Sequence, residues 1–352
     1  MAKRIPFSSP PSLPSEARCM KKIFPWLILI TFIIAFGVFL LIEIYRFPKS
    51  IDYSEPRADE LSEEKTITLI LVGDIMLNRG VEYMVERYGN VDFKFPFLKI
   101  VDYLKEADIV FGNLEGIISD KGIKVGSIYS FRANPEAIEG LKFAGFNVLS
   151  LANNHTLDYT RAALEDCLAN LNNAGINYVG AGFNETEAFS PIIKEIKGIK
   201  IGFLAYTNLG PETWRAVREN SGIAWISEKD FERVKADIKL AKEKVDVLIV
   251  SLHTGEEYSN EPTLFQIEFS KTAIDAGADL VIGHHPHLIQ RDEKYKNGWI
   301  FYSLGNFIFD QGFSSETMRG QILGVIIKDK KIKEIISREI EINEFFQPKI
   351  LE

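Results

Sequence analysis

The residues of this chain that could act in catalysis or metal binding follow short apolar runs in the sequence. Each of its five histidines follows a run of apolar and β-branched residues typical of a buried strand, and so do two acids and an asparagine. Imidazole, carboxylate and amide groups bind divalent metal ions, and histidine is also the commonest general acid or base. The residues with this potential are Asp74, Glu115, Asn154, His155, His253, His284, His285 and His287.

Taken singly, some of these residues have a purely structural explanation. A histidine at a strand end, such as His253, is often a hydrogen-bonded part of the framework. His285 and His287 are two residues apart, so in an extended segment their side chains point the same way, which favours a shared ion. Several such groups at equivalent strand ends favour a metal site. The mixture of nitrogen and oxygen donors, without cysteine, indicates one or two divalent ions of Mn, Zn or Fe.

Such a site has a defined use. Two divalent ions about 3.5–4 Å apart can share a carboxylate, lower the pKa of a bound water and stabilise both the attacking and the leaving oxygen. A neighbouring histidine that is not a ligand can donate the proton that the leaving group needs. The pattern therefore predicts a metal-dependent hydrolase site.

The segments around these residues alternate between strand and helix patterns. This alternation predicts an α/β fold with helices covering both faces of the sheet. The polar residues follow the carboxyl ends of the strands, where ligands bind in open α/β sheets, so one site built from five loops is expected. Strand patterns occupy residues 66–74, 107–113, 146–152, 200–207, 245–253, 278–285, 299–307, 320–328 and 332–342, and helical patterns occupy 95–107, 135–145, 160–175, 227–244 and 262–277.

Seven segments between about residue 66 and residue 312 form an ordered motif series. They are LVGDIMLNRG, FGNLEG, SFRANPE, LSLANNHTLDY, VSLHTGEEY, DAGADLVIGHHPHLIQ and FYSLGNFIFDQ. The series resembles that of the capsule-synthesis protein CapA family, which takes part in poly-γ-glutamate production. That family in turn resembles the calcineurin-like metallophosphoesterases. The resemblance implies a metallophosphoesterase-like α/β sandwich of mixed β-sheets flanked by helices.

The resemblance also implies a set of metal ligands. Asp74 corresponds to the first metal aspartate of the metallophosphoesterases, and Glu115 takes the place of the bridging aspartate. The superfamily pattern has a histidine two residues after the first aspartate, whereas this chain has Met76, which removes one expected ligand. The implied metal ligands are Asp74, Glu115, Asn154, His253, His285 and His287.

Other residues of the motifs receive supporting roles. By the same resemblance His155 is the catalytic acid, and His284 lies behind the ligands unless the register of the last motif shifts by one. Arg79 and Arg132 are expected to bind an anionic substrate group, the alternative being solvated surface charges. Asn306 supports the site or caps a turn.

An uncharged stretch of 20 residues covers positions 23–42. At about 1.5 Å per residue it is long enough to cross the roughly 30 Å hydrocarbon core of a bilayer. Lysine and arginine are more numerous before it than after it, so the N-terminus is expected in the cytoplasm and the remainder outside the cell membrane. The predicted organisation is a cytoplasmic tail (1–22), a single-pass transmembrane signal anchor (23–45), a linker (46–64) and a CapA-like domain (65–345).

The charge balance limits the partners. The chain has a net charge of −8 although its first 49 residues are basic, so the predicted domain is strongly acidic. An acidic domain is a poor binder of nucleic acid, and none is expected. An anionic substrate would depend on metal ions or local arginines. The two cysteines, Cys19 and Cys167, lie on opposite sides of the predicted anchor, so no disulfide between them is expected.

Three functions are compatible with these observations. The site could hydrolyse a phosphoester, or it could hydrolyse amide or γ-glutamyl bonds of an anionic surface polymer. The third is a non-catalytic subunit of polymer export or assembly, with a vestigial or structural metal site, that works with other capsule or poly-γ-glutamate synthesis subunits. Met76 favours the second and third functions. The leading prediction is a membrane-anchored protein of capsule or poly-γ-glutamate biosynthesis with a metal-bound hydroxide nucleophile and His155 as general acid.

Overall fold

The computed structural model describes residues 33–34, 36–38, 66–125 and 127–351. The predicted tail and linker, and most of the predicted anchor, lie outside these residues. No helix within the described ranges has both the length and the apolar character needed to cross a bilayer. From residue 66 onward the described chain belongs to one compact unit, Glu64–Glu352, which contains every predicted site residue.

The first sheet of this unit is mixed. Its parallel part contains β1, β2, β5 and β6, with β15 also parallel to β1, while β16, β17 and β18 are antiparallel. The order is β18-β17-β16-β1-β2-β5-β6. The strands are β1 (Ile67–Ile75), β2 (Ile109–Leu114), β5 (Phe146–Ser150), β6 (Asn177–Val179), β15 (Asn306–Ile308), β16 (Arg319–Lys328), β17 (Lys331–Ile342) and β18 (Pro348–Ile350).

The second sheet has the order β13-β14-β12-β11-β9-β8. Its four inner strands are parallel, and its two outer strands pair antiparallel. The strands are β8 (Ile192–Ile196), β9 (Ile199–Thr207), β11 (Val247–His253), β12 (Leu280–His284), β13 (Asp292–Tyr295) and β14 (Gly298–Phe301). Two small pairs complete the strands: β3 (Ile117–Ile118) with β4 (Arg132–Ala133), and β7 (Ala181–Gly182) with β10 (Gly222–Ile223).

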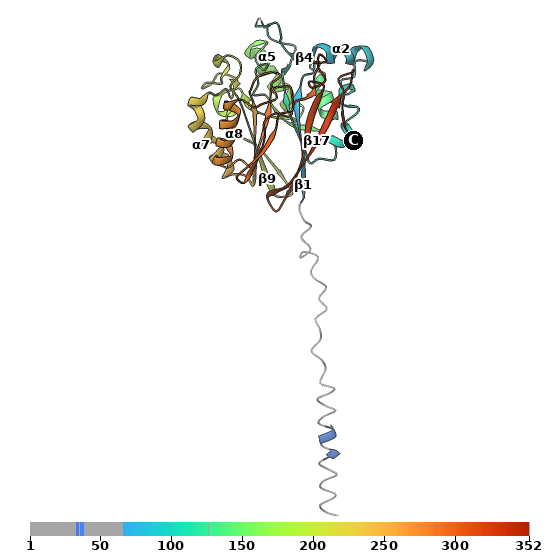
Figure 1. Cartoon of the computed structure of the whole chain (residues 1–352), viewed down its shortest axis with the longest axis vertical. Coiled ribbons are helices and arrows are strands. Elements are labelled where there is room, and N and C mark those ends of the chain that lie inside the picture. The colour runs from blue at the N-terminus through green and yellow to red at the C-terminus, as the bar shows by residue number, and fades with distance from the viewer. Residues whose placement is uncertain (1–32, 35, 39–65, 126, 352) are drawn as a thin grey trace, which may run out of the picture. The chain divides into compact units, whose positions relative to one another are not determined.

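The helices are short and flank the sheets. In Figure 1, α7 and α8 lie on the outer side of the sheet that contains β9, and α2 and α5 lie at the upper edge of the unit. The α-helices are α2 (Arg79–Tyr88), α3 (Val101–Leu104), α4 (Ala137–Phe143), α5 (Thr160–Asn173), α6 (Glu185–Ala188), α7 (Phe231–Lys242) and α8 (Leu264–Ala276), and the 3-10 turns are η1 (Phe95–Phe97), η2 (Glu212–Trp214) and η3 (Glu228–Asp230). The structure confirms the predicted α/β fold of mixed sheets flanked by helices.

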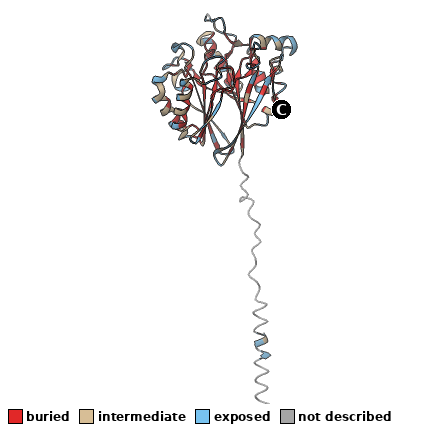
Figure 2. Cartoon of the chain, viewed as in Figure 1, coloured by how far each residue is buried: buried red, intermediate tan, exposed pale blue. Residues whose placement is uncertain are grey.

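Apolar side chains divide between three layers, as Figure 2 shows by the buried strands at the centre of the unit. Successive residues of a strand point to opposite faces, so Leu69 and Leu71 of β1 enter the layer between the sheets while Ile70 and Val72 face the helices. Burial on both faces explains why these strands read as continuous apolar runs. The layers define an α/β/β/α sandwich.

One predicted strand, residues 299–307, is in fact two strands in different sheets. β14 ends at Phe301 in the second sheet, and β15 begins at Asn306 in the first. Gly305 between them has φ +67°, and a side chain on Gly73 would meet the Gly305 carbonyl oxygen, so this crossing requires both glycines. The crossing places Asn306 beside Asp74, the residue with which it is in register.

Other differences from the predicted elements are local. The pattern at 95–107 predicted one helix, whereas the structure has the 3-10 turn η1 and the single helical turn α3. Helix α2, directly after β1, was not predicted. By contrast, the predicted helix at 262–277 is confirmed as α8, with a Thr263–Gln266 capping box at its start and Gly277 in the left-handed conformation at its end.

Candidate metal centre

The carboxyl end of the first sheet supplies a buried carboxylate, Asp74. It is fully buried at the end of β1, in register with Asn113 of β2. The Asn113 side-chain amide donates to Asp74 Oδ1 (2.8 Å), and the backbone N–H of His285 donates to Asp74 Oδ2 (3.1 Å). These two donors fix the orientation of the carboxylate and link the two sheets.

Glu115 lies one residue beyond β2 and is also buried. Neither of its carboxylate oxygens has a hydrogen-bond partner among the described residues. The nearest basic groups are the Nε2 atoms of His287 and His155, 3.7 and 3.8 Å from Oε1. Because a buried, unpaired carboxylate is costly, these orphaned oxygens fit a bound cation.

The second sheet brings imidazoles to the same place. His253 ends β11 and is in register with His284 at the end of β12. The ring centroids of His253 and His285 are 5.0 Å apart, and those of His285 and His287 are 5.9 Å apart. His285 and His287 have φ values of +98° and +59°, which place the backbone in the left-handed region. Two residues of the loop after β12 therefore have a backbone conformation that non-glycine residues seldom adopt.

His284 differs from its neighbours. Its Nδ1 lies 3.3 Å from Asp74 Oδ1, and among the described residues neither ring nitrogen has a partner with hydrogen-bond geometry. Its ring is fully buried beside Phe111. His284 therefore lies between Asp74 and the apolar layer that contains Phe111.

The loop after β5 adds Asn154 and His155. The Asn154 side-chain oxygen is 2.7 Å from His253 Nε2, so Asn154 lies beside the cluster of histidines. His155 Nδ1 is 2.7 Å from Asp158 Oδ2, and its ring stacks on Phe131 with centroids 3.8 Å apart. Asp158 and Phe131 therefore fix the orientation of this ring, whose Nε2 lies 3.8 Å from Glu115 Oε1.

The electrostatics favour ion binding. Burial would raise the pKa of Asp74, but the imidazoles of His284, His253 and His287 hold it below its usual range. Burial raises the pKa of Glu115 well above its usual range, and the Asp74 charge adds to this rise. Burial lowers the pKa of His285 to about 3 and also lowers the pKa of His253 and His287. Neutral imidazoles offer the lone pairs that metal ligation requires.

Two groups of ligand atoms are compact enough to hold an ion. Within each group all ligand atoms lie within 4.8 Å of one another. One group is Asp74, Glu115 and His253, and the other is Glu257, His285 and His287. These groups contain five of the six predicted ligands, together with Glu257, which the sequence analysis did not identify. The sixth, Asn154, belongs to neither group but contacts His253.

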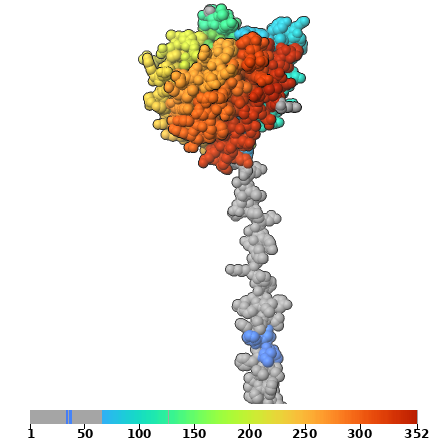
Figure 3. All heavy atoms as spheres, in the orientation of Figure 1, coloured from blue at the N-terminus to red at the C-terminus, as the bar shows by residue number. Residues whose placement is uncertain are grey.

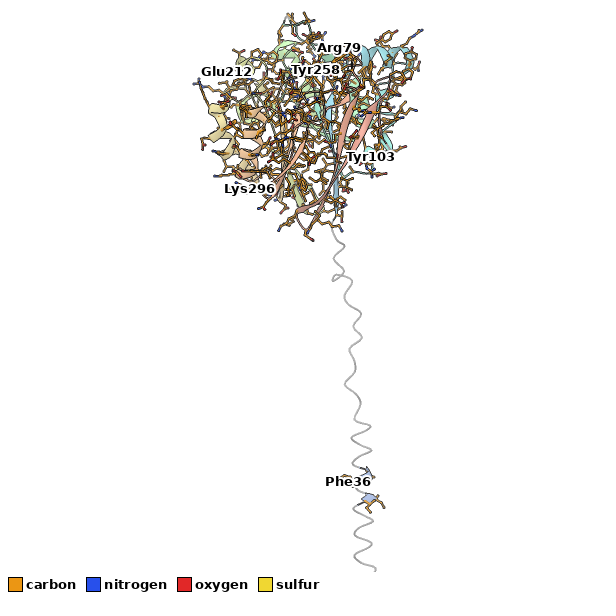
Figure 4. The ribbon with its side chains drawn as sticks, in the orientation of Figure 1. Phe36, Arg79, Tyr103, Glu212, Tyr258 and Lys296 are labelled. Atoms are coloured by element: carbon orange, nitrogen blue, oxygen red, sulfur yellow. The ribbon has the colours of Figure 1, made fainter. Side chains whose placement is uncertain are left out.

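A pocket of about 430 Å³ opens beside these groups. In Figure 4 the labelled Arg79 and Tyr258 both lie at the edge of the unit where this pocket opens. The lining residues are Arg79, Ser127, Tyr129, Phe131, Asn154, His155, Glu257, Tyr258, His287, Asp310, Gln311 and Phe313. His155, two of the predicted ligands (Asn154 and His287) and Arg79 therefore share one opening.

The two predicted substrate arginines lie in different surroundings. Arg79 begins α2, lines the pocket, pairs with Asp310 through two hydrogen bonds (2.6 and 3.1 Å), and stands over the Phe131 ring. Arg132 is not among the residues that line the pocket. Its guanidinium donates to the Lys121 carbonyl (2.8 Å) and lies over Tyr159. The structure thus places Arg79 at the pocket and Arg132 away from it.

Asn306, predicted to support the site or to cap a turn, contacts one of the predicted ligands. Its side-chain oxygen is 2.9 Å from His287 Nδ1, and its amide donates to the Thr317 carbonyl and to Gln311. The sequence analysis missed Asn113 and Asp158. Asn113 is a polar residue within an otherwise apolar buried strand, and Asp158 follows His155 by three residues, and each was a usable signal.

This architecture is a two-sheet α/β sandwich with a candidate metal centre where the carboxyl ends of both sheets meet. Residues 68–311 match the family described as bacterial capsule synthesis protein PGA_cap, and the chain belongs to that family. It is 36% identical over 257 residues to the capsule biosynthesis protein CapA of Bacillus anthracis, covering 72% of this chain and 62% of that protein. It is 33% identical over 262 residues to the PGA biosynthesis protein CapA of Bacillus subtilis, covering 74% and 67%.

Solved structures similar to the chain share little of its sequence. One is a novel phosphatase from Mycoplasma pneumoniae, with 17% identity and a TM-score of 0.45 over 79% of this chain and 94% of that one. Another is the NAD nucleotidase of Haemophilus influenzae, with 10% identity and a TM-score of 0.45 over 82% and 54%. At these values the similarity does not bear on activity.

Proposed function

We propose that the chain is a membrane-anchored, extracytoplasmic protein of capsule or poly-γ-glutamate biosynthesis with a metal-dependent hydrolase site. Family membership supports the biosynthetic role, because two relatives are named for capsule and PGA biosynthesis. The single observation that carries the site is the buried Glu115 carboxylate, with neither oxygen hydrogen-bonded among the described residues and two imidazoles near it.

Six residues would hold one or two divalent ions of Mn, Zn or Fe: Asp74, Glu115, Asn154, His253, His285 and His287. Such ions supply Lewis-acid chemistry, which activates water and stabilises negative charge on the reacting group. His155 is the general acid. Asp158 holds its Nδ1 and Phe131 its ring plane, so that Nε2 is left to give a proton to the leaving group.

The favoured substrate is an amide or γ-glutamyl bond of an anionic surface polymer. The water loses one proton to solvent, its oxygen adds to the carbonyl carbon, and the C–N bond breaks. The leaving amine takes a proton from His155, which regains one from solvent. Arg79 is fixed by Asp310 through Nε and Nη2 and lines the pocket, where its remaining nitrogen, Nη1, can bind a carboxylate of the polymer. A phosphoester is the alternative substrate, and the same residues would serve it.

Hydrolysis is tested with the full-length chain in detergent, purified without chelator. After metal analysis, the protein is assayed on poly-γ-glutamate and on a generic phosphodiester. His155→Ala is expected to lower turnover about 100-fold or more while the metal content is unchanged. Full turnover in this variant would contradict the assignment of His155, and a chain that takes up no divalent ion would contradict the proposed site.

A non-catalytic subunit of polymer export or assembly is the second candidate. Met76 favours it, because that residue stands where the superfamily pattern has a metal-binding histidine. A chain that holds metal but hydrolyses neither substrate would support this assembly role, with other synthesis subunits as partners.

The location is proposed from the sequence. The apolar stretch at 23–42 and the basic residues before it support a single-pass signal anchor in the cell membrane with a cytoplasmic N-terminus. Protease added to intact cells is expected to digest the domain while leaving an N-terminal tag intact. Protection of the domain would contradict this orientation.

A further inference from the structure

Residue 76 cannot supply a ligand to the metal centre. Met76 is fully buried in the apolar layer between the first sheet and its helices. Its sulfur accepts a hydrogen bond from the Asn78 N–H (3.3 Å), and its own N–H donates to the Ile308 carbonyl (2.8 Å). The side of the centre around Asp74 and His287 therefore needs a donor from elsewhere in the fold.

A carboxylate is available in the loop after β11. Glu257 is exposed and lines the pocket, and its carboxylate lies within 4.8 Å of ligand atoms of both His285 and His287. Oxygen donors of this kind suit Mn, Fe and Zn.

The backbone around Glu257 is held in place. The Tyr258 N–H donates to the Pro286 carbonyl (2.9 Å), its ring stacks on His287 with centroids 6.0 Å apart, and its hydroxyl accepts from Gln311 (3.2 Å). Gly255 makes the turn with φ +125°, where a side chain would meet Gln266. The loop after β11 is thus tied to the histidine loop after β12, with Glu257 beside the imidazoles.

Charge also favours a third carboxylate. Asp74 and Glu115 carry at most two negative charges, and two divalent ions would leave the buried centre with excess positive charge. The nearby carboxylate of Asp310 does not offset this excess, because its charge is already paired with Arg79. Glu257 would lower the excess by one charge.

We propose that Glu257 is a metal ligand, and that its carboxylate takes the place of the histidine absent at position 76. The inference rests on the proposed metal site and adds to it a ligand from a different strand end. The ion near His285 and His287 would then be held by residues of the second sheet and by the shared carboxylate of the first.

The test uses Co²⁺ as the probe, because its visible absorption reports the coordinating atoms. Full-length chain in detergent is titrated alongside Glu257→Gln and its matched neighbour Glu256→Gln. Both variants remove one exposed negative charge, but only Glu257 lies in a candidate ligand group. Glu257→Gln is expected to weaken one Co²⁺ site about tenfold or more and to change its absorption spectrum, while Glu256→Gln behaves as the parent.

The outcomes separate this inference from the proposed function. If the parent binds Co²⁺ and Glu257→Gln matches it in affinity and spectrum, Glu257 is not a ligand and the hydrolase proposal stands. Weakened binding with an unchanged spectrum would mean that Glu257 acts only through its charge, which also overturns the inference. If the parent binds no Co²⁺, both proposals fail.

Discussion

The two sheets contribute to the candidate metal centre in different ways. The first sheet provides the buried carboxylates at the ends of β1 and β2, and the loop after β5 adds Asn154 and His155. The second sheet provides the remaining four histidines, at and after the ends of β11 and β12: His253, His284, His285 and His287. Oxygen donors thus come mainly from one sheet and nitrogen donors from the other, so neither sheet has a complete centre.

The apolar layer between the sheets therefore sets the distance between the two kinds of donor. Phe111 of β2 and Phe203 of β9 stack in this layer with centroids 5.4 Å apart and planes 7° from parallel. Both rings are fully buried. Close packing transmits small shifts, so a change in this layer should alter the centre without touching a ligand.

The largest expected effect comes from removing one donor of each kind. Glu115→Gln and His285→Gln should each lower Mn²⁺ affinity by more than about 100-fold, because each removes a direct ligand and loss of even a supporting residue costs 10–100-fold. Titration with Mn²⁺ measures the change. Glu268→Gln, on the exposed face of α8, is the control and should bind as the parent. A loss of Mn²⁺ affinity in His285→Gln alone would contradict the proposal that both sheets supply ligands.

A smaller effect is expected from the layer between the sheets. Phe203→Ala and Phe269→Ala each remove a fully buried ring, one between the sheets and one between the second sheet and its helices. Each should destabilise the fold by about 3–5 kcal/mol. Only Phe203→Ala should also lower Mn²⁺ affinity, by about tenfold, because only that ring separates the two donor sets.

Thermal unfolding gives the stability change, and Mn²⁺ titration well below the midpoint gives the affinity. Phe203→Leu provides a milder variant if the alanine variant does not fold. Equal Mn²⁺ affinity in the Phe203 and Phe269 variants would show that the layer between the sheets does not set the donor spacing.

The smallest effect concerns substrate binding on the side of the first sheet. Arg79→Lys keeps the charge but loses the planar fork, so the KM for an anionic polymer should rise about tenfold, near the worth of one charge-assisted hydrogen bond. Turnover at saturation should change little. Arg132→Lys should leave KM unchanged, because Arg132 does not line the pocket. A larger effect at Arg132 would reverse these assignments.

The sequence was most informative where the signal is local. A buried strand followed by a polar residue is a short-range pattern, and it located Asp74, Glu115, His155 and His253 at the rim. The helical pattern at 262–277 was equally local, and the structure confirms it as α8. The family resemblance then ordered these residues into ligands and an acid.

The misses share a different cause, because they depend on contacts between distant segments. Residues 299–307 look like one strand, and only the packing of Gly73 against Gly305 shows that the chain changes sheets there. Glu257 reaches the site through the tie between Tyr258 and Pro286. Spacing along the chain does not report such contacts.

The surrounding fold holds the residues of the candidate centre in place. Figure 3 shows side chains from the last part of the chain, orange to red, filling the face in view without interruption between the second sheet and β16 and β17. Within the described residues, the donors belong to strand ends or to loops tied by backbone hydrogen bonds, so little rearrangement is needed to bring them to an ion.

The left-handed backbone at His285 and His287 links ion binding to the stability of the fold. Each such conformation costs on the order of 1–3 kcal/mol in a non-glycine residue, and glycine would relieve it while deleting the imidazole. The backbone strain at these two residues thus lowers the thermal stability of the ion-free protein. Ion binding offsets this strain only in the native state. The melting temperature should therefore rise with the free concentration of the ion, and a chelator should lower it.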